Sequence, residues 1–243
     1  MPPTILLKAI FHKNLPSQIM PDINALNEAT ERTGKEFSVT VAEKRKGQYF
    51  VCNNARGTQS ATDAPPCDMV HGRSRRLLDI HTHPISDRTI GITPSGSDIY
   101  TTLRDSMMEK QTLQSCITNH QTPLIGCYKN KKMPNKQKLD IYEQAAISQM
   151  YGDNSYLIDH FPVDFVTMFY RPQDGKRVTN PQPNDVVDAA FGGAAEKLKT
   201  SVDEFDKSAF CVFIQAMTMP KDDRVSMECR RRLSQPRDFW DQI

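Results

Sequence analysis

The chain has 243 residues, enough for one large domain or for a domain with a long extension. Its 31 basic and 29 acidic side chains leave a net charge of +2, which predicts no general attraction to nucleic acid or to acidic membranes. The sequence has no apolar run of roughly 18 residues and no basic, apolar leader after Met1, so we expect neither a membrane span nor a secretory signal.

The first half of the chain predicts strands and helices in mixed order. Apolar side chains at helical spacing followed by Gly34 predict a helix that ends at that glycine. Two short segments rich in β-branched and aromatic residues predict a hairpin. The expected order is strand 5–11, helix 16–33, strands 36–42 and 48–53, loop 54–66, strand 76–83, loop 84–94 and helix 95–111.

The second half is also mixed, which indicates an α/β or α+β fold with a core at residues 1–135 and a C-terminal α/β extension at 136–243. The apolar segment at residues 209–217 fits either a strand or a buried helix. The other expected elements are a hairpin at 115–128 that turns at 121–123, helix 139–150, strand 161–170, loop 171–184, helix 185–201 and a charged helix at 224–243 with Phe239 and Trp240 as apolar anchors.

Two compositional features have simple interpretations. The basic clusters at 44–46, 73–76, 129–132 and 230–232 are expected to be solvated surface. Six cysteines without a CxxC pair indicate reduced, mostly buried thiols and a cytoplasmic protein. They are Cys52, Cys67, Cys116, Cys127, Cys211 and Cys229.

The most informative stretch is a His-x-His pair on a predicted strand, followed by Ser-x-x-Asp at the start of a helix. Side chains at positions i and i+2 of a strand face the same way, so His81 and His83 project together. Two imidazoles suit zinc, and Asp98 in the first turn of the next helix supplies the third ligand of a catalytic site whose fourth position holds water. The sequence therefore predicts a single zinc ion per chain, held by His81, His83 and Asp98, that activates water for hydrolysis. With that ligand set available, Cys67 is not expected to bind the metal.

Each motif also has a non-catalytic interpretation. A His-x-His pair on a strand is often merely packed or exposed, and Ser95 or Ser97 can serve as the N-cap of the helix. Their combination in one strand–loop–helix unit favours metal chemistry. A cap is compatible with ligation, because it fixes the helix start and so aims Asp98.

A water-activating site also needs a general base, and one carboxylate can act as base and then as acid. Glu36 is the candidate, because it begins a predicted strand directly after the helix that Gly34 ends. Glu31 and Glu43 compete with it, but we expect both to be solvated. The Ser95 hydroxyl is a candidate donor to the oxyanion that forms when a carbonyl is attacked.

This arrangement resembles the JAMM, or MPN-plus (JAB-domain), metalloprotease family. The family pattern is an upstream Glu at the start of a strand, then His-x-His-Pro, then Ser-x-x-Asp. Here it corresponds to Glu36, to His81-Thr82-His83-Pro84 and to Ser95-Gly96-Ser97-Asp98. The resemblance covers residues 5–130.

The resemblance implies a deaminase-like curved mixed sheet flanked by helices, and a zinc-dependent isopeptidase of the deubiquitinase kind. Its substrates would be conjugates or precursors of ubiquitin or a ubiquitin-like modifier. His81, His83 and Asp98 would hold zinc, Glu36 would be the acid and base, and Ser95 would steady the oxyanion. Neither nucleic acid nor a membrane is an expected partner, and the sequence indicates no oligomeric state.

Two alternatives remain open from the sequence. His-x-His on a strand also resembles the first metal-binding strand of barrel metallohydrolases, although a (β/α)₈ barrel of about 250 residues would need more chain after His83 than is present. A non-catalytic MPN-type scaffold that only binds partners is the other alternative, and such domains usually lose the metal ligands.

Overall fold

The computed structural model describes residues 14–45, 47–58, 75–84, 91–193 and 207–234. The strands are β1 (Phe37–Arg45), β2 (Gln48–Arg56), β3 (Arg75–Thr82), β4 (Gln114–Thr118), β5 (Ile125–Asn130), β6 (Phe165–Tyr170) and β7 (Arg177–Val178). The helices are η1 (Ser17–Ile19), α1 (Met20–Thr33), α2 (Gly96–Met108), α3 (Lys136–Met150), α4 (Ser155–Asp164), α5 (Pro183–Phe191), α7 (Lys207–Thr218) and α8 (Asp223–Ser234).

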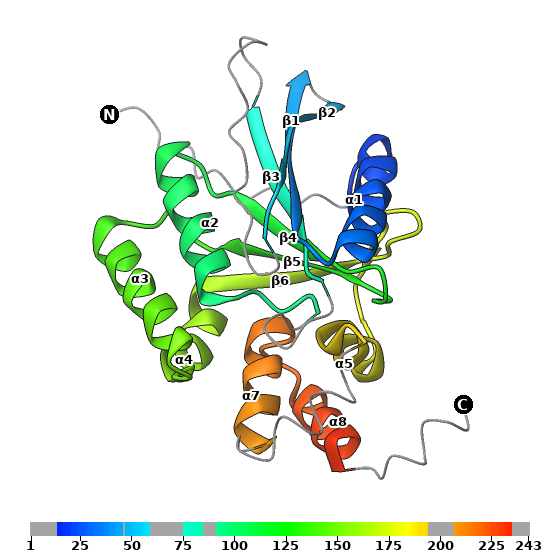
Figure 1. Cartoon of the computed structure of the whole chain (residues 1–243). Coiled ribbons are helices and arrows are strands. Elements are labelled where there is room, and N and C mark those ends of the chain that lie inside the picture. Colours follow the sequence, from blue (N-terminus) through cyan, green and yellow to red (C-terminus); the bar gives the residue numbers. More distant parts are fainter. Residues whose placement is uncertain (1–13, 46, 59–74, 85–90, 194–206, 235–243) are drawn as a thin grey trace, which may run out of the picture.

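The described strands form one mixed sheet in the order β2-β1-β3-β4-β5-β6-β7. β3 and β4 are parallel, and the other neighbouring pairs in this sheet are antiparallel. The sheet is strongly curled and flanked by helices (Figure 1), which agrees with the predicted α+β class. A barrel of parallel strands is therefore excluded for the described part of the chain.

Helices cover both faces of the sheet. α1 packs on one face, where its apolar side chains join those of β1, β3, β4, β5 and β6 in one core. The other face carries a second core, which is covered by α2, α3, α4, α5, α7 and α8. β6 and β7 lie after residue 135 yet extend the same sheet, so the predicted C-terminal extension shares these cores. Among the described helices, none is long and apolar enough to cross a bilayer.

Most elements of the first 130 residues are confirmed within a few positions. The predicted helix at 16–33 is η1 and α1, and it ends at Gly34, which has the left-handed φ of 63° that favours glycine. The predicted hairpin is β1 and β2, although β2 continues to Arg56, into the segment expected to be a loop. The strand and helix that carry the motif are β3 and α2.

The predicted strand at 161–170 is wrong for its first four residues. Residues 155–164 form α4, which buries Leu157 and Phe161 one helical turn apart, and only Phe165–Tyr170 are strand. A short apolar run does not by itself distinguish a buried helix from a strand. The same ambiguity at 209–217 is resolved in favour of helix α7.

Helix α5 is shorter than predicted, because Gly192 ends it in a left-handed conformation. The predicted strand at 5–11, Cys67, and the anchors Phe239 and Trp240 lie outside the described residues.

The expectation of reduced thiols is wrong. Cys116 on β4 is bonded to Cys127 on β5, its direct cross-strand partner, and Cys211 on α7 is bonded to Cys229 on α8. Cys52 is also disulfide-bonded. Since disulfides persist mainly in oxidising compartments, the cysteines no longer support a cytoplasmic location.

Candidate metal centre

The carboxyl-terminal end of β3 presents two histidines to the layer that contains α2. Leu78 and Ile80 face α1, so the alternation of a strand turns His81 the other way. The His83 N–H donates to Thr118 O at 3.0 Å, which extends the β3–β4 pairing by one residue. Both imidazoles are buried, and their Nε2 atoms lie 3.2 Å apart.

Helix α2, the crossover between the parallel strands β3 and β4, brings Asp98 to the histidines. Asp98 Oδ1 lies 3.3 Å from His81 Nε2, and Oδ2 lies 3.7 Å from His83 Nε2. Ser95 is the N-cap of this helix: its hydroxyl accepts the Asp98 N–H at 3.1 Å, and its own N–H donates to Asp98 Oδ2 at 2.7 Å. This reciprocal capping box holds Oδ2 and leaves Oδ1 facing His81.

A backbone carbonyl orients His83. Its Nδ1 lies 2.8 Å from the carbonyl oxygen of Gly91. A carbonyl only accepts, so Nδ1 carries a proton and Nε2 is the nitrogen that is turned toward Asp98. This second contact is typical of histidines that bind metals.

The carboxylate of Asp98 is in the charge state that a metal ligand needs. Burial raises the pKa of this group, but the facing imidazoles of His81 and His83 outweigh burial and lower the pKa well below its usual value. Asp98 is therefore ionised at neutral pH.

The three predicted ligands, His81, His83 and Asp98, are brought together in a geometry that fits a metal ion. One ligand atom from each lies within 4.8 Å of the other two. Nitrogen ligands about 2.05 Å from a tetrahedral zinc would be about 3.3 Å apart. The observed separations from His81 Nε2 are 3.2 Å to His83 Nε2 and 3.3 Å to Asp98 Oδ1.

Strand register places Glu36 beside this cluster. Ser38 on β1 pairs with His81 on β3. Because the pairing is antiparallel, Glu36, two residues earlier, comes opposite His83, two residues later, and on the same face. The Glu36 N–H donates to Thr58 O at 2.8 Å, so the residue continues the β1–β2 hairpin beyond its last paired strand residue.

The environment of Glu36 suits proton transfer. The residue is 3% exposed, and burial raises its pKa to about 7, with His83 lowering the pKa and Asp98 raising it. A carboxyl group with a pKa near neutrality can both accept and release a proton at physiological pH.

The competing carboxylates lie elsewhere. The Glu31 side chain is 62% exposed and lies 3.8 Å from His120 Nε2. Glu43 accepts the Gly47 N–H at 2.9 Å and faces Arg75 at 3.6 Å.

Two residues near the centre were missed from the sequence. Gly91 supplies the carbonyl for His83, and Gln149 on α3 accepts a hydrogen bond from the first turn of α2. Neither belongs to a motif, and Gln149 lies 51 positions after Asp98, so no local pattern could have identified them.

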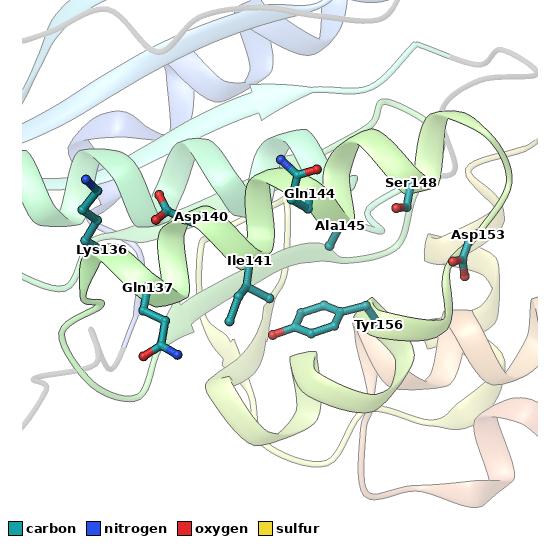
Figure 2. A pocket seen from close by; sticks show the side chains of 9 residues that line it. All are labelled: Lys136, Gln137, Asp140, Ile141, Gln144, Ala145, Ser148, Asp153 and Tyr156. Carbon is teal, nitrogen blue, oxygen red and sulfur yellow. The ribbon is translucent and has the colours of Figure 1, made fainter.

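A separate hollow of about 640 Å³ lies between α3 and α4. Figure 2 shows its lining on the two helices and the turn between them, with Ile141, Ala145 and Tyr156 among polar side chains. No candidate site residue lines this hollow, and its lining offers no histidine. The hollow is therefore separate from the His81–His83–Asp98 cluster, the group that could hold a metal ion.

No protein-family model matches the chain, and no curated protein matches its sequence significantly.

Proposed function

We propose that this protein is a zinc-dependent peptidase or isopeptidase. The observation that carries the proposal is the meeting of two imidazole nitrogens and a carboxylate oxygen within 4.8 Å, with a buried carboxyl of pKa about 7 on the same face. His81, His83 and Asp98 would hold the ion, since two nitrogen ligands and one oxygen ligand are a common set in catalytic zinc sites. Zinc bound there would supply a Lewis acid that activates water and polarises a carbonyl near neutral pH.

The protein's own groups then have defined tasks. The Glu36 carboxylate accepts a proton from the attacking water and delivers it to the nitrogen of the departing amine. The Gly91 carbonyl keeps the Nδ1 proton of His83 in place, so that Nε2 is the nitrogen that would bind the ion. Ser95 remains the candidate oxyanion donor, although its hydroxyl is within 2.7 Å of Asp98 Oδ2 and would have to exchange that partner.

The substrate class rests on the resemblance to the JAMM family. It points to amide bonds at the C-terminal tail of ubiquitin or a ubiquitin-like modifier. The disulfides of the chain weigh against a substrate of a reducing compartment, so the assay should also include unrelated peptides.

The first experiment measures the metal content of the purified protein beside a His81→Ala/His83→Ala double variant. We expect about one zinc per chain in the wild type and none in the double variant, because two of three ligands are gone. A metal-free wild type would reject the proposal and favour the non-catalytic scaffold.

The second experiment tests the proton shuttle with Glu36→Gln. This variant should keep its zinc but lose roughly 10²- to 10⁴-fold in turnover of a ubiquitin C-terminal amide or a peptide amide, since glutamine cannot move a proton. Glu31→Gln is the matched control and should retain wild-type turnover. Full activity in Glu36→Gln with zinc bound would remove Glu36 from the mechanism.

A further inference from the structure

The start of α2 is held by α3, a helix of the region after residue 135. The backbone N–H of Gly96, the first residue of α2, donates to Gln149 Oε1 at 2.5 Å. α3 also packs closely there, because a Cβ on Gly96 would lie 2.8 Å from Ala146 Cα. Gln149 is itself held, since its Nε2 donates to Asn154 Oδ1 at 2.9 Å.

This contact adds to the capping of α2. The first N–H groups of a helix have no partner within the helix. In the capping box the Ser95 hydroxyl accepts the Asp98 N–H, and Gln149 Oε1 accepts the Gly96 N–H. Asp98 lies in this first turn, so the contacts that order the turn also set where its carboxylate lies.

Helix α5 positions Gly91, whose carbonyl oxygen is the hydrogen-bond partner of the second ligand, His83. The Ile92 N–H donates to Ala189 O at 3.0 Å. Gly91 lies so close to α5 that a Cβ there would be 2.0 Å from the same oxygen, and its φ is +44°. The carbonyl that fixes His83 is therefore itself positioned by α5.

We propose that α3 and α5 position the metal ligands: α3 holds Asp98 through Gln149, and α5 holds His83 through Gly91 and Ile92. The proposal rests on the metal site proposed above. In this proposal, two helices from the region after residue 135 hold the metal ligands in position. Gln149 is a positioning residue, because it touches neither the ligand atoms nor the ion.

The test measures the affinity of the full-length protein for Zn²⁺ by competition with a chromophoric chelator, and the absorption spectrum of the Co²⁺-loaded protein. Gln149→Ala should weaken Zn²⁺ affinity by about 10-fold, the lower end of the effect of losing an outer contact of a metal site. Gln144→Ala, the same change on an exposed position of α3, should leave affinity and spectrum unchanged.

A third variant separates positioning from mere packing. Gln149→Glu keeps an oxygen for the Gly96 N–H, and a carboxylate is favourable at a helix N-terminus, but it loses the donor to Asn154. We therefore expect Gln149→Glu to retain affinity within about threefold. If the Zn²⁺ affinity of Gln149→Glu were as low as that of Gln149→Ala, the hydrogen bond to Asn154 would be the contact that sets the affinity. The proposal for Gln149 would then be rejected.

The second part is tested with Gly91→Ala, which introduces the clash with Ala189 O. Gly47→Ala is its control, because Gly47 also has a positive φ, +82°, but a Cβ there has no atom within 4 Å. Only Gly91→Ala should alter the Co²⁺ spectrum and weaken Zn²⁺ binding.

The outcomes distinguish the two proposals. A wild type without affinity for Zn²⁺ defeats the proposed function and this inference with it. A wild type that binds Zn²⁺, with Gln149→Ala and Gly91→Ala equal to it, defeats the inference alone.

Discussion

Ser95 and Asp98 form the smallest unit that organises the centre. Each supplies a partner for the backbone N–H of the other, so one residue pair starts the helix and aims a ligand. Both sequence interpretations of Ser-x-x-Asp are therefore compatible in one structure. The cap is observed, whereas oxyanion donation by Ser95 stays a prediction.

Replacing Ser95 by alanine should lower the free energy of unfolding by about 1 kcal/mol, because the Asp98 N–H loses its acceptor. The same change should weaken metal binding, since Asp98 Oδ2 loses the hydroxyl within 2.7 Å. Urea denaturation and chelator competition measure the two effects. Ser97→Ala, at an exposed neighbouring position, is the control, and equal losses in both variants would contradict the assigned cap.

At the scale of elements, a buried ion network joins β3 to α2. The Arg76 guanidinium donates to Asp79 at 3.0 and 2.5 Å and to Asp105 on α2 at 2.8 Å. The basic cluster at 73–76 was expected to be solvated, and this expectation is wrong for Arg76, whose side chain is 5% exposed. The register of β3 against β1 shifts between Leu78 and Arg76, so Arg76 reaches α2 although Leu78 faces α1.

Arg76→Ala should destabilise the protein by about 3–5 kcal/mol, because two buried carboxylates would lose their counter-charge. Arg75→Ala is a matched control on the preceding residue. Its side chain is 54% exposed and lies 3.6 Å from Glu43, so its loss should cost less than about 1 kcal/mol. Thermal and urea unfolding of both variants test the difference, and a small effect of Arg76→Ala would show that the network contributes little.

At the scale of the whole molecule, disulfides tie neighbouring elements within the two cores. Cys116–Cys127 joins β4 to β5 on the α1 face, and Cys211–Cys229 joins α7 to α8 on the opposite face. The bonded pairs are 11 and 18 residues apart in sequence, so each closes a short loop.

Because the described cysteines are all bridged, the denatured but unreduced protein should show almost no reactive thiol. After reduction it should show six per chain. Reduction should also lower the free energy of unfolding by about 2–4 kcal/mol for each bond. Thiol titration and unfolding with and without reductant measure this, and six thiols before reduction would restore the expectation of a reducing compartment.

The local features of this protein were predictable from its sequence. Helical spacing and Gly34 located α1, alternation and β-branched residues located β1, and the capping signal located the start of α2. His81, His83 and Asp98 could be grouped because they belong to one strand–loop–helix unit. Such signals depend on neighbours within a few residues along the chain, so they are present in the sequence itself.

Only the tertiary structure decided the remainder. Strand register put Glu36 opposite His83, helix packing brought Gln149 to Gly96, and sheet pairing set Cys116 against Cys127. The burial of Arg76 and the split of residues 161–170 between α4 and β6 were decided in the same way. These outcomes depend on which distant segments pack together, and the free energy of that packing is shared among many residues, so no short pattern records it.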